Sequence, residues 1–127
     1  MDGRPLVAPQ MPALQVMQRD SDFEWCATRL KALADPGRLR IVDLLLEGAK
    51  TVSELANELD TALVNVSHHL RVLREANLLQ ARRRGKFVVY SVHPEVAARA
   101  TVENERSLDL GCCRLDLAAN QNLNHSA

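Results

Sequence analysis

Apolar residues recur at helical spacing in the first part of the chain and predict two successive helices. The first is expected over residues 22–34, where Ser21-Asp22-Phe23-Glu24 has the form of a capping box. The second is expected to begin at Pro36, with Asp35 as its N-cap, and to end at Gly48. The positions expected to face the core are Phe23, Cys26, Ala27, Leu30, Leu33, Ala34, Leu39, Val42, Leu45 and Leu46.

Two further helices are predicted by the same spacing. Thr51-Val52-Ser53-Glu54 repeats the capping-box pattern and opens a short helix that ends at a tight break at Asp60 and Thr61. A longer helix follows over residues 62–76, and Asn77 suits a left-handed C-terminal cap. The inward positions are expected to be Val52, Leu55, Ala56, Leu59, Leu63, Val66, Leu70 and Leu73.

After Asn77 the pattern becomes extended. Leu78–Arg82 and Phe87–Val92 indicate two strands around the basic turn Arg83-Arg84-Gly85-Lys86. Two helices joined by a tight turn and followed by such a hairpin have the organisation of a helix-turn-helix with a wing. The sequence therefore predicts a mainly α fold with a two-stranded β wing, a winged helix-turn-helix.

Charge is distributed unevenly along the chain. The 16 basic and 16 acidic residues cancel overall. Between Ala62 and Tyr90, however, the acidic Glu75 stands against the basic Arg71, Arg74, Arg82, Arg83, Arg84 and Lys86. A run of charge is usually a solvated face, but this one falls on the helix over residues 62–76 and on the wing.

That placement is typical of a DNA-binding surface, because an α-helix fits the major groove and basic residues on a flanking loop neutralise phosphates. The candidate DNA-binding residues are Val64, Asn65, Ser67, His68, Arg71, Arg82, Arg83, Arg84 and Lys86. His69 lies toward the apolar side with Val66 and Leu70, so we expect it to be satisfied inside the fold rather than to contact bases.

Four segments resemble successive core segments of the ArsR/SmtB family of dimeric winged-helix repressors. They are "LKALADPGRLRIVDLLLEG", "TVSELANEL", "VSHHLRVLREANLL" and "RRRGKFVVYSV", and the resemblance covers about residues 26–93. It implies a homodimer that binds a palindromic operator on double-stranded DNA and is released when an ion or another effector binds. It also implies a dimer built from the first and last helices.

On this chain the last helix would open at Pro94-Glu95. Its apolar positions would be Val96, Ala97, Ala100 and Val102. Two ion sites familiar in the family cannot be carried over to this chain. The stretch Ser53–Leu59 lacks the cysteines of one site, and the last helix, after His93, lacks the histidines of the other.

The remaining candidates for sensing are the three cysteines, Cys26, Cys112 and Cys113. Sulfur ligands select soft, thiophilic ions. Trivalent arsenic matches three sulfurs, and a methylated arsenical would need only Cys112 and Cys113; trivalent antimony, lead, mercury and cadmium are alternatives. Cys26, on an apolar helix stripe, can equally be a small core residue.

Adjacent thiols converge on one ion only where the backbone is irregular, because neighbours on a strand or a helix point in different directions. Gly111 supplies conformational freedom beside Cys112 and Cys113. The flanks Leu108-Asp109-Leu110 and Leu115-Asp116-Leu117 alternate in different registers. We therefore expect a bulge or turn between two short extended pieces.

The chain of 127 residues, 46% of them apolar, is long enough for one compact domain without a disulfide framework. We expect a flexible arm over residues 1–20, a DNA-binding and dimerisation domain over 21–105, and a cysteine-containing segment and tail over 106–127. An odd number of cysteines fits a reducing compartment, so free thiols are expected. The sequence contains no long apolar run and no signal-peptide pattern, which predicts a cytoplasmic protein without membrane contact.

Two other functions remain in view. The cysteines could form a redox or persulfide switch on the same repressor, in which oxidation between protomers changes the dimer. A thiol enzyme is disfavoured, because the chain has no Cys-x-x-Cys, no glycine-rich phosphate loop and no metal-hydrolase signature.

Overall fold

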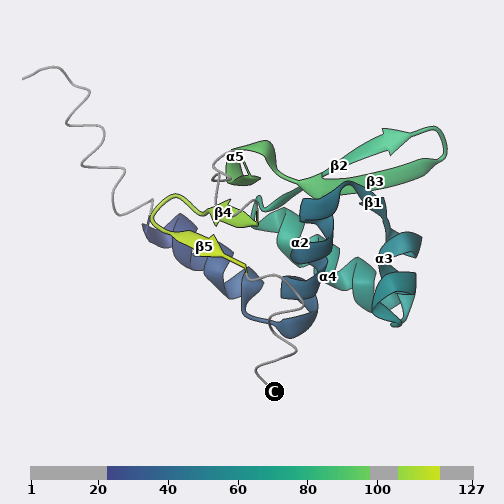
Figure 1. The fold of residues 1–127 in the computed structure, drawn as a ribbon, viewed down its shortest axis with the longest axis horizontal. Helices are drawn as coiled ribbons and strands as arrows, with labels where there is room; N and C mark the ends of the chain where they lie inside the picture. Colours follow the sequence, from purple (N-terminus) through teal and green to yellow (C-terminus); the bar gives the residue numbers. More distant parts are fainter. Residues whose placement is uncertain (1–22, 98–105, 118–127) are drawn as a thin grey trace, which may run out of the picture.

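The computed structural model describes residues 23–97 and 106–117. A helix over residues 23–33 is followed by a helix-turn-helix unit, a β-hairpin wing and a second, smaller hairpin (Figure 1). The elements are α2 (Pro36–Glu47), β1 (Lys50–Thr51), α3 (Val52–Leu59), α4 (Leu63–Glu75), β2 (Leu79–Arg84), β3 (Phe87–Val92), α5 (Pro94–Ala97), β4 (Ser107–Asp109) and β5 (Arg114–Asp116).

Local capping interactions set the helix boundaries, as the sequence predicts. The Asp35 side chain accepts a hydrogen bond from the Arg38 backbone N–H at the start of α2 (3.1 Å). Thr51 and Glu54 form both bonds of a capping box at the start of α3. Asn77, just after α4, takes the left-handed conformation with φ of 60°. The cap expected at Ser21 and Asp22 lies outside the described residues.

The wing is an antiparallel hairpin, and its turn contains fewer residues than the sequence predicts. Arg84 pairs with Phe87, so Gly85, at φ of 60°, and Lys86 form a two-residue turn. The prediction that Arg83 and Arg84 belong to the turn is wrong, because the pairing of β2 with β3 continues through both. Gly85 alone supplies the positive φ that the tight connection needs.

A third strand completes the wing sheet, which has the order β1-β3-β2. Lys50 pairs with Tyr90 and Thr51 with Val89. The sequence gives no sign of β1, because two residues are too few to show an alternating pattern. The strand fixes the start of α3 against the base of the wing.

The core gathers side chains from every helix and from both hairpins. Its fully buried members include Ile41, Leu55, Val66, Leu70, Leu73, Leu78, Val96, Leu108 and Leu110. Five positions predicted to face inward are instead exposed: Phe23 (57%), Leu30 (42%), Leu63 (52%), Ala27 and Ala34. Those predictions are wrong for the single chain, because helical spacing fixes which residues share a face but not whether another element covers it.

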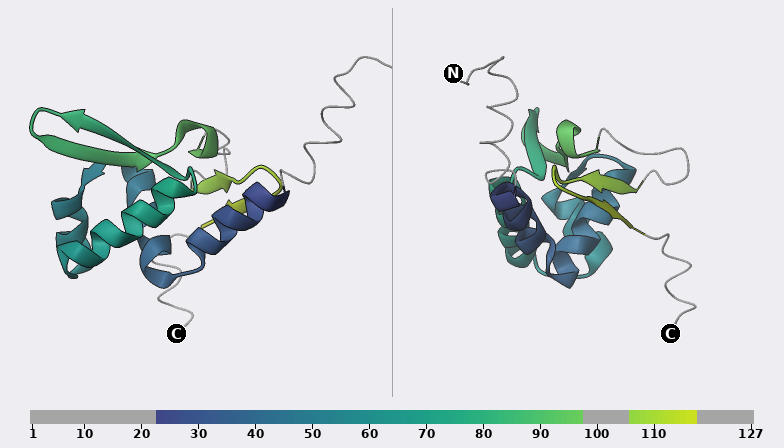
Figure 2. Two further views of the ribbon diagram at one scale, coloured as in Figure 1. Left: turned by 180° about the vertical axis from the view of Figure 1, so that it is seen from behind. Right: turned by 90° about the vertical axis from the view of Figure 1, so that its left-hand side faces the viewer.

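The second hairpin lies along the helix over residues 23–33, at the opposite end of the molecule from the wing (Figures 1 and 2). β4 pairs with β5 in register Leu108↔Leu115, and Gly111 in the connecting turn has φ of 103°. The predicted turn between two extended pieces is therefore confirmed. Leu108 and Leu110 are both buried, so the hairpin is part of the common core.

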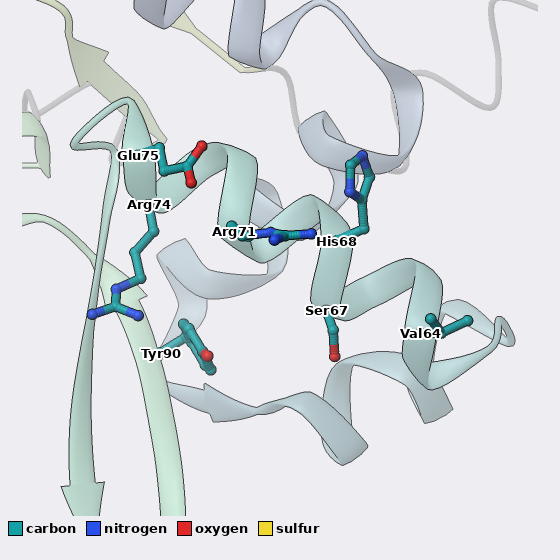
Figure 3. A pocket seen from close by; sticks show the side chains of 7 residues that line it. All are labelled: Val64, Ser67, His68, Arg71, Arg74, Glu75 and Tyr90. Atoms are coloured by element: carbon teal, nitrogen blue, oxygen red, sulfur yellow. The ribbon is translucent and has the colours of Figure 1, made fainter.

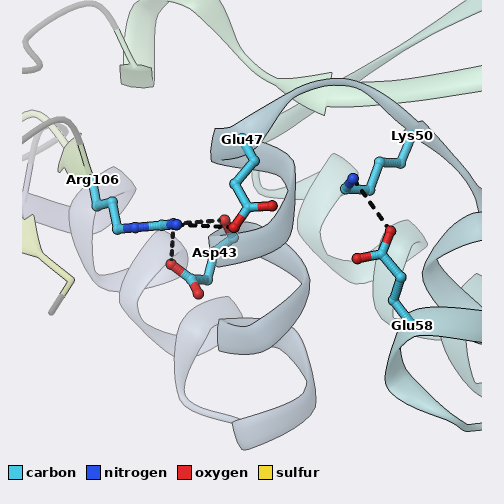
Figure 4. A network of polar contacts seen from close by, with 5 residues as sticks. All are labelled: Asp43, Glu47, Lys50, Glu58 and Arg106. Atoms are coloured by element: carbon cyan, nitrogen blue, oxygen red, sulfur yellow. Dashed lines mark hydrogen bonds and ion pairs between the residues drawn. The ribbon is translucent and has the colours of Figure 1, made fainter. Parts of the chain in front are cut away.

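An ion-pair network ties the start of this hairpin to α2 (Figure 4). The Arg106 guanidinium donates to the Asp43 carboxylate and carbonyl oxygen, and also to Glu47 Oε2 (3.0 Å).

The structure describes only the start of the last predicted helix, which is α5. Ala100 and Val102, expected further along that helix, lie outside the described residues. No helix among the described residues is long and apolar enough to span a membrane.

Replacing Leu108 with Ala tests whether the second hairpin contributes to the core. Because Leu108 is 1% exposed, its truncation should lower the free energy of unfolding by about 2–5 kcal/mol. Leu115→Ala is the matched control, since Leu115 is only partly buried on the paired strand and should cost less. Urea unfolding measures both, and equal small losses would show that the hairpin is not a core element.

Candidate nucleic-acid interface and thiol cluster

An open groove of about 770 Å³ runs between α4 and the wing (Figure 3). Val64 stands at one end of it, and Arg74 and Tyr90 lie at the wing end. The residues that line the groove are Val64, Ser67, His68, Arg71, Arg74, Glu75 and Tyr90. Four of the five candidate DNA-binding residues on the predicted helix therefore line one concave surface, and the fifth, Asn65, is exposed outside it, in a second hollow that His69 also lines.

The wing carries the other candidates. Arg82, Arg83 and Arg84 are exposed along the end of β2, and Lys86 is exposed in the turn. The Lys86 ammonium lies 5.8 Å from the centroid of the Phe87 ring, which is itself 56% exposed. Four cationic side chains thus project from the wing on the same hairpin that borders the groove.

Arg74 and Tyr90 line the groove but are absent from the candidates that the sequence suggests. Arg74 follows Arg71 by three residues, a spacing that puts both on one helix face. Arg74 could therefore have been predicted from the sequence. Tyr90 carried no such signal, because only the tertiary arrangement of the wing and α4 brings it to the groove.

His69 lies on the opposite side of α4, where it contacts α2, as expected. Its Nδ1 accepts a hydrogen bond from Arg38 Nη1 (3.2 Å), and its Nε2 lies 3.7 Å from Asp35 Oδ2. Arg38 Nε also donates to the Ala32 carbonyl oxygen (2.5 Å). Arg38 therefore joins three elements: the helix over residues 23–33, α2 and the groove helix α4.

Asp35 is electrostatically adapted to this position. The backbone N–H of Arg38 donates to its carboxylate and, with the positive charge of the Arg38 side chain, lowers the pKa of Asp35 below its ordinary value of 3.8. Partial burial opposes this effect without cancelling it. The carboxylate stays ionised while it caps α2.

The three cysteines, far apart in the sequence, form one cluster. Their Sγ atoms all lie within 4.8 Å of one another. Cys26 is buried on the helix over residues 23–33, whereas Cys112 and Cys113 are exposed in the turn between β4 and β5. Cys26 is thus both a core residue and a member of the cluster, so its two interpretations do not exclude each other.

Two of these sulfurs are bonded to each other. Cys26 and Cys112 form a disulfide, with Cα atoms 5.9 Å apart, and Cys113 is free. The prediction of free thiols is therefore wrong for Cys26 and Cys112. The sequence could not reveal the pairing, because the two residues are separated by 86 positions and meet only when the hairpin packs on the first helix.

Arg29, one helical turn from Cys26, holds the thiol hairpin in place. Its Nη1 donates to the Leu110 carbonyl oxygen (3.0 Å), and its guanidinium carbon lies 5.2 Å from the centroid of the Trp25 ring. Within the described residues, its buried Nε has no hydrogen-bond partner. Arg29 thus places a cation beside the turn that carries Cys112 and Cys113.

The chain matches the family model "Bacterial regulatory protein, arsR family" over residues 35–81. It is 36% identical over 66 residues to the transcriptional repressor SdpR of Bacillus subtilis (strain 168), covering 52% of this chain and 73% of SdpR. The protein belongs to the ArsR/SmtB family of DNA-binding transcriptional repressors. The matched residues 35–81 include α2, α3 and α4, but none of the three cysteines.

A second relative is the arsenic resistance transcriptional regulator ArsR1 of Pseudomonas putida (strain KT2440), with 45% identity over 67 residues. The match covers 52% of each protein, so the chain spans about half the length of that relative. Among solved structures, the homodimeric winged helix-turn-helix DNA-binding domain of Mb0332 from Mycobacterium bovis is similar, with a TM-score of 0.61 and 29% identity. The match covers 78% of this chain and 82% of that solved fragment, residues 1–100 of Mb0332, and confirms the winged helix-turn-helix fold.

Asp35→Asn separates the charge of the α2 cap from its hydrogen bond, because Asn is also a good N-cap. The pKa of Asp35 is lowered in the folded state, so its charge stabilises the fold fully above the ordinary pKa of 3.8. That contribution is lost as the pH falls through the lowered folded value. Urea unfolding from pH 7 to pH 3 should show wild type more stable than Asp35→Asn at neutral pH, with the gap closing below about pH 4. A gap that does not change with pH would contradict the assignment.

Proposed function

We propose that this protein is a homodimeric repressor that binds a palindromic operator through α4 and the wing and is released when a thiophilic ion binds Cys26, Cys112 and Cys113. The favoured effector is trivalent arsenic or a methylated arsenical. The observation that carries the effector assignment is the convergence of the three sulfurs within 4.8 Å. We place the protein in the cytoplasm, where its DNA would be.

The DNA half of the proposal is supported by the shape and charge of one surface. The groove between α4 and the wing presents polar side chains, two arginines and one carboxylate, that of Glu75, and four basic residues extend from the wing beside it. Asn65, Ser67 and Arg71 are residue types that hydrogen-bond base edges. Arg83 and Arg84, on the strand leading to the turn, suit phosphate contacts.

The dimer is supported by large apolar side chains that are left exposed on the helix over residues 23–33. Phe23, Trp25 and Leu30 are between 42% and 57% exposed on this one helix. A second copy of the chain would bury them, as the resemblance to dimeric repressors implies. Mb0332, the similar structure from Mycobacterium bovis, is a homodimer.

The sulfur cluster fits a thiophilic ion once the disulfide is reduced. Three thiolates are the donor set that soft ions prefer, whereas oxygen donors suit hard ions. All three sulfurs come from one chain, so the site would be complete in each protomer. ArsR1, a relative with 45% identity, is an arsenic resistance regulator, which favours arsenic among the soft ions.

The described contacts also offer a physical connection between the two sites. The thiol hairpin is fastened to α2 through Arg106 and to the helix over residues 23–33 through Arg29. Both of those elements are linked to the groove helix through Arg38 of α2, which donates to the Ala32 carbonyl oxygen and to His69. An effector that prefers a different placement of the hairpin would therefore act on the position of α4.

The disulfide favours a second candidate function, in which oxidation rather than an ion is the signal. Oxidation between protomers is the form of this switch predicted from the sequence, but the Cys26–Cys112 bond lies within one chain. A titration followed by ultraviolet spectroscopy and mass spectrometry separates the candidates. Sulfur-to-ion charge transfer favours the ion, and a change of mass to a disulfide or polysulfide favours redox sensing.

The wing prediction is tested with DNA selected by the protein from a random library. Arg83→Ala/Arg84→Ala should weaken binding to all sequences and flatten the salt dependence, with the log-log slope falling by about one for each lost phosphate contact. Asn65→Ala should instead change sequence preference, at a cost of about 1–3 kcal/mol if a bidentate base contact is lost.

Lys31→Ala is the matched control for charge, because Lys31 is exposed on the helix over residues 23–33, away from the groove. It should leave the salt slope unchanged. Fluorescence anisotropy over a series of salt concentrations provides the measurement. A wing variant with the wild-type slope would refute the role of the wing.

The thiol prediction is tested by release of reduced protein from the selected DNA. Cys112→Ser and Cys113→Ser should each bind DNA as wild type does but resist release by arsenite, because each loses a sulfur ligand. Cys26→Ser should resist release only if the ion needs three sulfurs. A panel of arsenite, methylarsenite, antimonite, lead, mercury, cadmium, zinc, peroxide and polysulfide identifies the effector. If the Cys112→Ser/Cys113→Ser protein is still released at the wild-type concentration, the cluster is not the sensor.

A further inference from the structure

The disulfide has a third sulfur beside it. Cys113 Sγ lies 3.4 Å from Cys26 Sγ, the atom that is already bonded to Cys112. Cys113 is free and exposed, and it follows Cys112 directly in the turn between β4 and β5. One buried sulfur, that of Cys26, is therefore within reach of two adjacent sulfurs on the hairpin.

We propose that Cys113 and Cys112 exchange places as the disulfide partner of Cys26. The Cys113 thiolate attacks Cys26 Sγ, a new Cys26–Cys113 bond forms as the Cys26–Cys112 bond breaks, and Cys112 leaves as the thiolate. One disulfide and one thiolate are present before and after the step. It needs no oxidant and no reductant.

The position of the three residues makes Cys26 the shared partner. Cys26 is 1% exposed and fixed on a helix, whereas Cys112 and Cys113 occupy a short turn with Gly111 at φ of 103°. The turn is closed by a hydrogen bond from the Leu110 N–H to the Cys113 carbonyl oxygen (2.9 Å). The exchange therefore requires side-chain rotation and a small adjustment of the turn, while β4 and β5 stay paired.

With this exchange, ion binding depends on the redox state of the three cysteines, a dependence that we call the redox gate. This consequence rests on the proposed function. Two thiols of the reduced cluster and one hydroperoxide give one disulfide, with water and the corresponding alcohol or a second water as products. In either isomer only one of the three sulfurs remains free, so the oxidised protein cannot offer three thiolates to an ion. Either Cys112 or Cys113 can form the disulfide with Cys26, so the loss of one of them leaves the redox gate intact.

Disulfide mapping on the full chain tests the exchange without any ion or DNA. The reduced protein is oxidised with hydrogen peroxide, treated with catalase and then labelled with iodoacetamide. Tandem mass spectrometry, which cleaves between Cys112 and Cys113, shows which of the two is labelled. In wild type both residues should be found labelled, in different molecules, because each isomer leaves a different thiol free.

The single variants are matched to one another. Cys112→Ser should form the Cys26–Cys113 disulfide, Cys113→Ser should form Cys26–Cys112, and Cys26→Ser should form no bond from the hairpin to the first helix. Label confined to Cys113 in wild type, together with no intrachain disulfide in Cys112→Ser, would overturn the proposal. Circular dichroism of each reduced variant confirms that its fold is intact.

A second measurement separates this inference from the ion assignment. Arsenite should bind the reduced protein and not the peroxide-treated protein, and dithiothreitol should restore binding. If mapping finds both isomers but arsenite binds neither redox form, the exchange stands and the proposed effector is wrong. If arsenite binds the oxidised protein as tightly as the reduced one, the redox gate is refuted.

Discussion

Burial of Leu108 and Leu110 in the common core is the constraint on which the thiol cluster depends. These two leucines hold the second hairpin against the rest of the fold, and only in that position do Cys112 and Cys113 reach Cys26. Apolar burial of two leucines is worth several kcal/mol, which is enough to place a short hairpin that could not be stable alone. The chemistry of the sulfurs is therefore a consequence of ordinary core packing.

The groove beside α4 and the thiol hairpin are separate surfaces, and polar contacts made by a few arginines connect the elements that carry them. The tip of the wing lies at one end of the molecule, and the thiol hairpin, β4 and β5, lies at the other (Figure 2). Arg106 links the hairpin to α2, and Arg38 links α2 and the first helix to His69 on α4. These contacts are directional and partly buried, so a displacement of the hairpin would change their geometry.

The two surfaces also differ in how far they are shared with relatives. The family model covers residues 35–81, which include the helix-turn-helix but neither the thiol hairpin nor the helix carrying Cys26. The helix-turn-helix is thus common to the family, while most of the wing and the cysteine cluster belong to the part of the chain outside that match.

Much of the fold was determined by the sequence through local signals. The caps at Asp35, Thr51 and Asn77 and the turn at Gly85 depend on atoms a few residues apart, so the helices and the wing could be predicted without tertiary contacts. Arg71 of the groove followed from its position on α4, whereas Arg74, on the same helix face, was not among the predicted residues.

Only the tertiary structure decided the exposure of Leu30 and Leu63, the pairing of β1 with β3, and the bond between Cys26 and Cys112. Each of these depends on segments that are distant in the chain. Helical periodicity identifies an apolar face but not the element that covers it. No pattern of neighbouring residues encodes the meeting of two sulfurs 86 positions apart, because that meeting is set by the packing of the whole core.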